Sequence, residues 1–400
     1  MSLLDQVHDY PFLNYRELAL DPRLDEARRS GTLTRIRLPY AGEAWLATRY
    51  ADVRKVLTDP RFSRAAAMGP DVPRQMPDPP FVSTIMDVDR PEHGRLRRLV
   101  AVAFTERRID GLRPYVRQVA HQLIDDMLRQ EPPVDLIQAL ALPLPMTVFC
   151  RTLGVPLEDR AEFRRWTESL VALRRITAEE FREVVESLEA YLRDLIRQRR
   201  EQPTEDLLSA LVHARDEGSR LTEQELISFG VTLLAAGFET TAGHIASSTY
   251  LLLTRPGLWS QLRADPAGLE RTVEELLRFV PLNGGTGLAR VAVEDVEFDG
   301  VTVRAGEAVF VSTISGNRDE EVFPEADSFR RDRTDPAPHL AFGWGPHRCL
   351  GARLATMELH EALAALRDRI PTLRLAVPAG NVSWKTGTIL RGPRELPVAC

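Results

Sequence analysis

Hydrophobic residues recur every three or four positions through most of the middle of the chain, with arginine and glutamate between them. This period is that of an α-helix with one buried face. It predicts helices over residues 95–104, 109–129, 134–153, 158–173, 178–200 and 204–217. Shorter runs with the same period predict two further helices, over residues 267–279 and 352–366.

The longest apolar run begins just after Thr222. Glu225 follows three residues later, and a threonine and a glutamate at this spacing are the signature of a capping box. Pro256 prevents a helix from continuing past it. The pattern therefore predicts one long apolar helix over residues 223–254.

Strand patterns are few and lie apart from the helical ones. Two runs near the start predict a hairpin, and three later runs predict short strands around an Asp299-Gly300 turn; the runs cover 33–38, 44–48, 296–298, 301–303 and 308–313. Residues 318–346 show neither period and contain four prolines, and so long a structureless segment is usually functional.

These elements predict a single, mainly α domain over residues 1–400 with a small β-rich region. The β-rich part is expected near 30–50 and 290–315 and at the C-terminal end, and the helical part near 90–280 and 350–366.

The composition narrows the class of protein. It is that of an average soluble protein, with 44% hydrophobic and 28% charged residues. A net charge of -6 gives no general attraction to nucleic acid or to anionic membranes. Residues 1–20 contain no signal peptide, and no stretch approaches the roughly 20 apolar residues of a membrane helix. The three cysteines, Cys150, Cys349 and Cys400, are too few for a disulfide framework. We therefore expect a cytoplasmic protein without nucleic-acid or membrane partners.

One short segment carries the strongest chemical signal. Residues 342–351 read Phe-Gly-Trp-Gly-Pro-His-Arg-Cys-Leu-Gly and directly precede the predicted helix over 352–366. The glycines permit a tight backbone around Cys349, and the start of a helix stabilises a thiolate. From these residues alone, Cys349 could be a nucleophile, a metal ligand or a structural cysteine, and the glycine framing favours a functional one.

The same segment resembles the haem-binding loop of the cytochrome P-450 family, the haem-thiolate monooxygenases. The matching residues are Phe342, Gly343, Gly345, His347, Cys349 and Gly351. Further motifs in the family's order extend the resemblance over nearly the whole chain. It implies the cytochrome P-450 fold, a single large domain that encloses haem b, with the thiolate of Cys349 as the iron ligand.

A glutamate and an arginine, Glu275 and Arg278, form the second motif. Three residues apart on a helix they can pair, although most such pairs are solvated. In the family this pair is buried and helps to hold the region of the haem loop. It normally has a third partner, often an arginine, at the position that Ser328 occupies here. That departure leaves three candidates for the third partner: Arg330, Arg331 and Arg333.

Residues 236–241, Ala-Gly-Phe-Glu-Thr-Thr, interrupt the long apolar helix with polar side chains. They could form a polar helix face whose threonines bind backbone carbonyls. The resemblance implies instead that this helix crosses the distal face of the haem. Ala236 would then contact the cofactor, the small residues at 236 and 237 would leave room for dioxygen, and Glu239 and Thr240 would be the catalytic residues that supply protons.

His93 and Arg97 stand four residues apart on a predicted helix and therefore share a face. They could be ordinary surface residues. The resemblance implies that they bind a haem propionate together with Arg290 and His347, which agrees with the need of buried charges for partners. The full set of expected cofactor contacts is His93, Arg97, Ala236, Arg290, Phe342, His347, Cys349 and Gly351.

The implied activity is the insertion of one oxygen atom from O2 into a bulky apolar small molecule. Hydroxylation or epoxidation of a secondary metabolite, such as a macrolide or another polyketide, fits the soluble bacterial members of the family that this chain resembles. The expected substrate pocket consists of Phe81, Val82, Ile85, Leu170, Val171, Phe229, Leu233, Gly285, Leu288 and Ile389.

The chain has no flavin or nicotinamide fingerprint and no cluster of cysteines for an iron–sulfur centre. Electrons from NAD(P)H are therefore expected to arrive through a ferredoxin and its reductase, and Arg98, Arg107 and Arg348 are candidates for contacting an acidic partner. The enzyme itself is expected to be a monomer.

Three other functions stay open at this point: a family member with peroxide-dependent or coupling chemistry, a haem sensor without turnover, and a hydrolase without haem. The last would use Cys349 as nucleophile and His347 as base.

Overall fold

The computed structural model describes residues 7–31, 33–75, 84–159, 161–163, 165–166, 178–214, 220–283, 288–334, 337–386 and 390–400. The chain divides into two compact units, each made of two stretches. The first unit consists of Met1–Gly94 and Glu275–Cys349, and the second of Arg95–Glu274 and Leu350–Cys400. The expectation of one domain over 1–400 stays a prediction.

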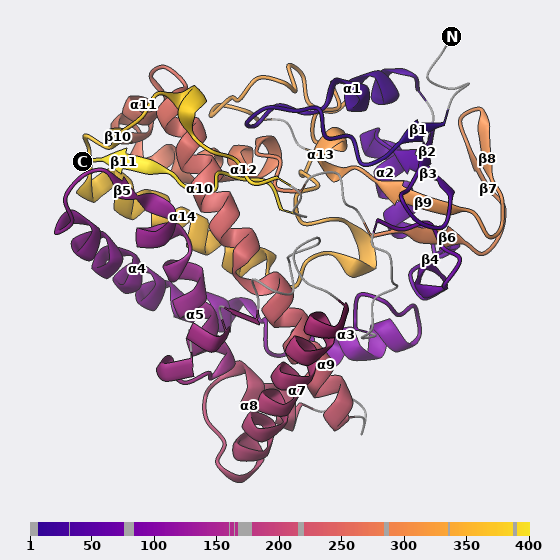
Figure 1. The fold of residues 1–400 in the computed structure, drawn as a ribbon, viewed down its shortest axis with the longest axis horizontal. Coiled ribbons are helices and arrows are strands. Elements are labelled where there is room, and N and C mark those ends of the chain that lie inside the picture. Colours follow the sequence, from indigo (N-terminus) through magenta and orange to yellow (C-terminus); the bar gives the residue numbers. More distant parts are fainter. Residues whose placement is uncertain are drawn as a thin grey trace. The chain divides into compact units, whose positions relative to one another are not determined.

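A six-stranded sheet forms the frame of the first unit (Figure 1). The strand order is β1 (His8–Asp9), β2 (Thr34–Arg37), β3 (Glu43–Ala47), β9 (Ala308–Val311), β6 (Arg290–Ala292) and β4 (Phe62–Ser63). The predicted hairpin is present, since β2 and β3 pair antiparallel. On its other edge, β3 pairs parallel with β9. A separate hairpin joins β7 (Val296–Phe298) to β8 (Val301–Val303), and Gly300 turns between them with a φ of 74°.

The helices of the first unit are short. They are α1 (Pro22–Arg29), α2 (Tyr50–Thr58), α13 (Thr313–Gly316) and the single turns η2 (Ala66–Met68) and η6 (Gly345–His347). The apolar face of α2 packs on the sheet, where Val53 and Val56 join Val309 and Val311 in one buried cluster. Two helices, α3 (Glu92–Ala101) and α12 (Leu269–Phe279), contain residues of both units.

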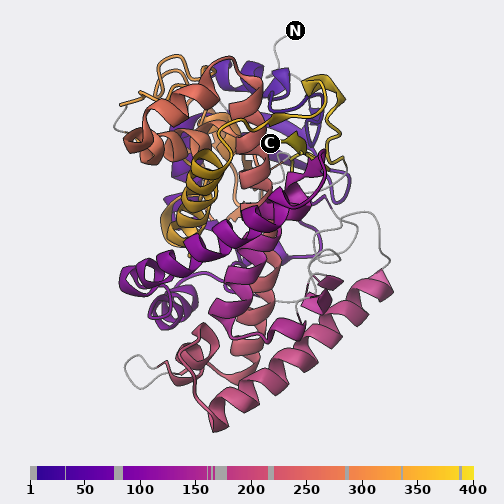
Figure 2. The ribbon, with the colours of Figure 1, turned by 90° about the vertical axis from the view of Figure 1, so that its left-hand side faces the viewer.

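The second unit is mainly helical (Figure 2). Its helices among the described residues are α4 (Glu106–Leu128), α5 (Pro143–Leu153), α7 (Ala178–Glu201), α8 (Leu207–His213), α9 (Glu223–Gly237), α10 (Glu239–Thr254), α11 (Leu258–Ala264) and α14 (Ala352–Arg369). Shorter turns are η3 (Ile137–Ala141), η4 (Leu157–Asp159), η5 (Pro266–Gly268) and η7 (Ala379–Asn381). A small sheet has the strand order β10 (Arg374–Leu375), β11 (Pro397–Ala399) and β5 (Val134–Asp135).

The predicted helix over 134–153 is wrong at its start. Val134 pairs with Val398 in β11, and the side chain of Asp135 accepts hydrogen bonds from the backbone of Ile137 and Leu396. Pairing with a strand far along the chain thus outweighs the local helical period, and a π-helical turn, η3, precedes α5. The helix predicted over 204–217 is also shorter, because Asp206 caps α8 by accepting from the backbone of Ser209.

The capping box is confirmed, since Thr222 accepts from the backbone of Glu225 while Glu225 accepts from the backbone of Thr222. The single helix predicted over 223–254 is instead two, because the backbone leaves helical geometry at Phe238, with φ of -125°. By length and composition, Glu223–Thr254 is apolar enough to cross a membrane, contrary to the sequence expectation. More than half of its most apolar window is buried inside the protein, and core helices of soluble proteins pass the same test.

A buried glutamate, Glu361, holds α14 to α4, which lie side by side in the second unit. Its carboxylate accepts from Arg113 at 2.6 Å and from Arg117 at 2.9 Å. Burial opposes ionisation of Glu361, but hydrogen bonds from His360, Arg117 and Arg113 outweigh it and lower the pKa to about 2.

We expect Glu361 to make the fold sensitive to acid. Its lowered pKa stabilises the folded state above the ordinary value of 4.5, and this stabilisation is lost as the pH falls towards about 2. Because the arginines are 41% and 57% exposed, we expect on the order of 2 kcal/mol rather than the full shift. Urea unfolding measures the free energy of unfolding near pH 5 and near pH 3. This free energy should fall less between the two pH values in Glu361→Gln than in the wild type. Glu106→Gln, at an exposed ion pair with Arg353 on the same two helices, is the control. If Glu361→Gln lowered the free energy of unfolding by the same amount at both pH values, the prediction would be contradicted.

Candidate active site

The loop before α14 is held by its own backbone. The amide of Gly343 donates to the carbonyl of Leu340, and the amide of Cys349 donates to the carbonyl of Phe342, both at 2.9 Å. Gly345 has a φ of 71°, and a Cβ there would lie 2.5 Å from the carbonyl oxygen of Leu57. Only glycine therefore allows the loop to approach α2 so closely.

Side chains from α2 fix the same loop within the first unit. The guanidinium of Arg54 stacks over the ring of Trp344 at 4.3 Å, which adds a cation–π attraction to the close approach at Gly345. The hydroxyl of Tyr50 donates to the carbonyl of Pro338 at 2.7 Å. Cys349 ends this rigid loop as an exposed cysteine outside any disulfide.

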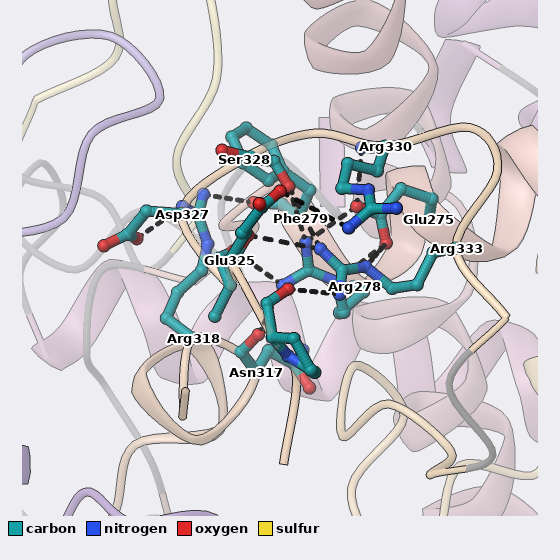
Figure 3. Close-up of polar contacts among 12 residues, drawn as sticks. Glu275, Arg278, Phe279, Asn317, Arg318, Glu325, Asp327, Ser328, Arg330 and Arg333 are labelled. Carbon is teal, nitrogen blue, oxygen red and sulfur yellow. Dashed lines mark hydrogen bonds and ion pairs between the residues drawn. The ribbon is translucent and has the colours of Figure 1, made fainter. Parts of the chain in front are cut away.

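Glu275 and Arg278 are both buried and form a two-pronged pair, with both distances 2.7 Å (Figure 3). The remaining N–H groups of Arg278 donate to the carbonyls of Asn317, Ala326 and Ser328. The side chain of Asn317 in turn accepts from the backbone of Leu340 at 2.6 Å. A continuous set of hydrogen bonds therefore links the pair to the start of the cysteine loop.

Arg333 supplies the third partner of the pair. Its Nε donates to Glu275 at 3.0 Å, and its side chain is 7% exposed (Figure 3). Arg330 contributes its backbone amide, which donates to Glu275 at 2.9 Å. Ser328 takes part only through its carbonyl, which accepts from Arg278 and Arg333. Of the candidates from the sequence, Arg333 thus places its guanidinium on Glu275.

Arg318 is a member of this network that the sequence did not reveal. Its guanidinium lies 3.7 Å over the ring of Phe279, donates to the carbonyl of Phe279 and pairs with Asp327. Burial, which Asp327 only partly offsets, lowers the pKa of Arg318 to about 10. The only sequence signal was an arginine in a segment without period, which many other arginines share.

A cluster of two histidines and two arginines lies elsewhere in the first unit. The rings of His93 and His347 lie against each other with their centroids 4.0 Å apart and their planes tilted by 38°. Burial, followed by the charges of His93, Arg290 and Arg64, lowers the pKa of His347 to about 3. Burial and the neighbouring Arg64 likewise lower the pKa of Arg290 to about 10. The predicted group of His93, Arg290 and His347 is therefore brought together, while Arg97 lies further along α3, in the second unit.

This cluster has the chemistry of a site for a carboxylate. Arg290 is 5% exposed, and no acceptor among the described residues binds its guanidinium. A buried guanidinium without an acceptor is costly, and a carboxylate supplies the acceptor and the charge at once. The first unit thus offers a thiol for iron, and a guanidinium with two imidazole rings for a propionate, so its residues fit haem.

Replacing Arg290 should weaken the hold on haem. We expect Arg290→Met to lower haem affinity about 10- to 100-fold, since a hydrogen bond to a charged group contributes roughly 1.5–3 kcal/mol. Haem transfer to excess apomyoglobin, followed by absorbance, measures the change. Arg304→Met is the matched control, because Arg304 is 67% exposed and pairs with Asp295. Identical rates of haem loss in Arg290→Met and wild type would contradict the assignment.

In the second unit, Thr240 lies in the first turn of α10. Its hydroxyl donates to the carbonyl of Ala236 at 2.9 Å, which is the back-bonded geometry considered from the sequence. Because the hydroxyl donates its proton in this bond, the lone pairs of its oxygen remain available to accept a hydrogen bond from another donor. Glu239 precedes it, is half-buried and has a polar or electrostatic contact of its own.

Gly237 has a packing reason to be small, and the expected role of leaving room for dioxygen stays a prediction. A Cβ at this position would lie 2.5 Å from the ring of Phe149, which also packs against Phe238. Close packing with α5 therefore requires glycine here, whatever the role of Ala236, which is exposed.

A buried glutamate on another helix, Glu358, neighbours the threonine that follows Thr240. Glu358 on α14 is 2% exposed and lies beside Thr241. Burial raises the pKa of Glu358 well above its ordinary value, although the neighbouring side chain of Thr241 opposes this. The sequence did not single it out, because a glutamate in a charged helix normally faces solvent. Gly351, expected at the cofactor, caps the start of α14.

Four of the ten predicted pocket residues are described. Ile85 and Phe229 are buried, Leu233 is half-buried, and Leu288 is 52% exposed. The other six lie outside the described residues: Phe81, Val82, Leu170, Val171, Gly285 and Ile389. The pocket as a whole therefore stays a prediction.

Comparison with known proteins gives consistent matches. The family model of cytochrome P450 matches residues 43–266 and 268–368. The chain is 48% identical to mycinamicin IV hydroxylase/epoxidase of Micromonospora griseorubida over 389 residues, which are 97% of this chain and 98% of the relative. It is also 48% identical to nocardicin C N-oxygenase of Nocardia uniformis subsp. tsuyamanensis over 390 residues, with the same coverage.

Among solved structures, the LnmA cytochrome P450 hydroxylase from the leinamycin biosynthetic pathway of Streptomyces atroolivaceus S-140 is similar with a TM-score of 0.93. The two chains are 49% identical, and the match covers 98% of this chain and 100% of that one. The mainly α fold with small sheets that the sequence predicted is confirmed.

Proposed function

The chain belongs to the cytochrome P450 family, and on that premise we propose that it is a haem-thiolate monooxygenase of secondary metabolism. It inserts one oxygen atom from O2 into a bulky apolar small molecule. The observation that carries the proposal is the rigid loop that ends in the exposed Cys349. The presence of Glu239 and Thr240, the residues proposed to supply protons, favours this function over that of a haem sensor or a cysteine hydrolase.

Haem b, held by a thiolate, supplies the activation of dioxygen when it is bound. Cys349 would provide the thiolate, and the carbonyl of Phe342 keeps the backbone of Cys349 in place. His93, Arg97, Arg290 and His347 would bind the propionates, and Phe342, Gly351 and Ala236 would complete the contacts. The buried Arg290 supports this assignment because it lacks an acceptor among the described residues.

Thr240 and Glu239 hold and deliver protons in the proposed mechanism. Donation by the Thr240 hydroxyl to Ala236 fixes the orientation of its oxygen, which can then accept a hydrogen bond from a reacting group. Glu239, one residue earlier, is the acid that resupplies the proton.

Thr240→Ala should uncouple electron consumption from product formation. Without the hydroxyl, protons are delivered poorly and reducing equivalents leave as hydrogen peroxide. We expect product formed per NAD(P)H to fall by on the order of tenfold or more, with peroxide rising in proportion. Thr240→Ser keeps a hydroxyl and is the control. Unchanged coupling in Thr240→Ala would show that this threonine has only its structural bond to Ala236.

The proposed substrate is a macrolide or another polyketide. The similarity to a mycinamicin hydroxylase/epoxidase supports hydroxylation or epoxidation at carbon. An equal identity to an N-oxygenase favours oxidation at nitrogen as a second candidate. Incubation with a panel of macrolides and amine-bearing metabolites under isotopically labelled dioxygen tests both. The oxygen label should enter a product of at least one compound of the panel, at carbon or at nitrogen. If no compound yields a labelled product, the proposed substrate class is contradicted.

We also propose that electrons from NAD(P)H reach the enzyme through a ferredoxin and its reductase. Arg98, Arg107 and Arg348 are exposed, as docking of an acidic partner requires. We propose a monomeric enzyme in the bacterial cytoplasm; the three cysteines, which form no disulfide, agree with that compartment.

A further inference from the structure

One buried guanidinium binds two segments that lead into the expected substrate pocket. Arg64 follows β4 and is 4% exposed. Its Nε donates to the carbonyl of Met86 at 2.9 Å, and one Nη donates to the carbonyl of Ala289. The other Nη pairs with Asp87 at 2.9 Å. All of these contacts lie within the first unit.

The first of these segments, residues 84–89, is attached to β4 at several points. Asp87 accepts from the backbone and the hydroxyl of Thr84, which closes a turn. The carboxylate of Asp89 accepts from the backbone amides of Arg64 and Ala65 and from the hydroxyl of Ser63. The carbonyl of Asp89 accepts from His93, so this attachment continues into the start of α3.

The second segment, residues 288–290, enters strand β6. This strand pairs with β4, where Val291 faces Ser63. Ladder hydrogen bonds fix the backbone from Arg290 onwards, and the bond from Arg64 to Ala289 extends this hold one residue towards Leu288. Arg64 is thus the side chain that spans both segments.

Resting on the proposed function, we propose that Arg64 is a positioning residue that sets the spacing of residues 84–89 and 288–290, and with it selectivity for bulky ligands. Met86 and Ala289 must both keep their carbonyls within reach of one planar guanidinium. Only arginine offers donors in such a fork, because the ammonium of lysine is a single point. The expected pocket residues Ile85 and Leu288 stand next to these two carbonyls in the chain.

A purely structural role for Arg64 makes a different prediction. If the buried pair with Asp87 only stabilises the fold, then a lysine that keeps the charge should preserve ligand selectivity. If the hydrogen bonds to the two carbonyls set the selectivity, Arg64→Lys should change ligand selectivity as much as Arg64→Met does. Arg64→Lys therefore separates charge from bridging.

The experiment uses haem-loaded protein and two azoles. Imidazole is small and tests access to the iron, while clotrimazole is bulky and also tests the pocket wall. Spectral titration gives the dissociation constant of each for wild type, Arg64→Lys, Arg64→Met and Arg61→Met. Arg61 is the matched control, since it lies three residues away and pairs with Asp59 at a site where its side chain is 39% exposed.

We expect the ratio of clotrimazole to imidazole constants to change about tenfold or more in both Arg64 variants and to stay constant in Arg61→Met. A ratio within about twofold of wild type in Arg64→Lys would overturn the inference, whatever the loss in stability. If Arg64→Met does not retain haem, the lysine variant alone decides. A wild type that shows no spectral change with imidazole would instead count against the proposed function, so the two failures are distinguishable.

Discussion

Cys349→Ser should abolish the red-shifted absorption band of the reduced carbon monoxide complex, and monooxygenase activity with it. A thiolate donates electron density to the iron and causes both properties, whereas a serine hydroxyl stays protonated and donates far less. The loop is held by bonds that do not involve the sulfur, among them the amide of Cys349 on Phe342 and the packing of Gly345 against Leu57. We therefore expect a folded variant that still binds haem, with an unshifted band.

Cys400→Ser is the matched control for this substitution, since Cys400 is also exposed and also outside any disulfide. It should leave the band and the activity unchanged. Wild-type protein that is folded and supplied with haem yet lacks the red-shifted band would contradict the central assignment. A red-shifted band retained in Cys349→Ser would show that another group ligates the iron.

Local patterns predicted most of the helices because their signals lie within a few residues. The capping box at Thr222 is an example, since both of its bonds join residues three apart. The errors arise where distant residues decide. Val134 is in a strand because β11 lies beside it, and the break at Phe238 accompanies packing against Phe149 from another helix. Neither partner can be identified from the local period.

The site shows the same division. The motif around Cys349 was recognisable because its glycines and cysteine are consecutive, and Arg333 was among the candidates for Glu275 because it follows Ser328 closely. Arg64 and Arg318 were not found, since their roles depend on carbonyls far away in the chain and the sequence holds 52 lysines and arginines. Burial, not residue type, distinguishes these two guanidinium groups.

Arg333→Met should strongly destabilise the region that carries the cysteine loop. The substitution removes the bond of Arg333 to the buried Glu275 and leaves the carbonyls of Pro324 and Glu325 without this donor. Glu275 keeps its pair with Arg278, so we expect a cost of about 2–4 kcal/mol rather than the full penalty of an unpaired buried charge. Urea unfolding of the haem-loaded protein measures this cost.

Arg330→Met is the control for this prediction, because Arg330 holds Glu275 through its backbone amide, which methionine retains. Its side chain is 39% exposed and pairs with Glu325 and Asp332, so its loss should cost about 0–1 kcal/mol. Bonds from Arg278 to Asn317 and from Leu340 to Asn317 connect the network to the cysteine loop. The red-shifted band should therefore disappear at lower urea in Arg333→Met than in Arg330→Met. Equal midpoints in the two variants would show that the backbone amide of Arg330, and not the guanidinium of Arg333, completes the pair of Glu275 and Arg278.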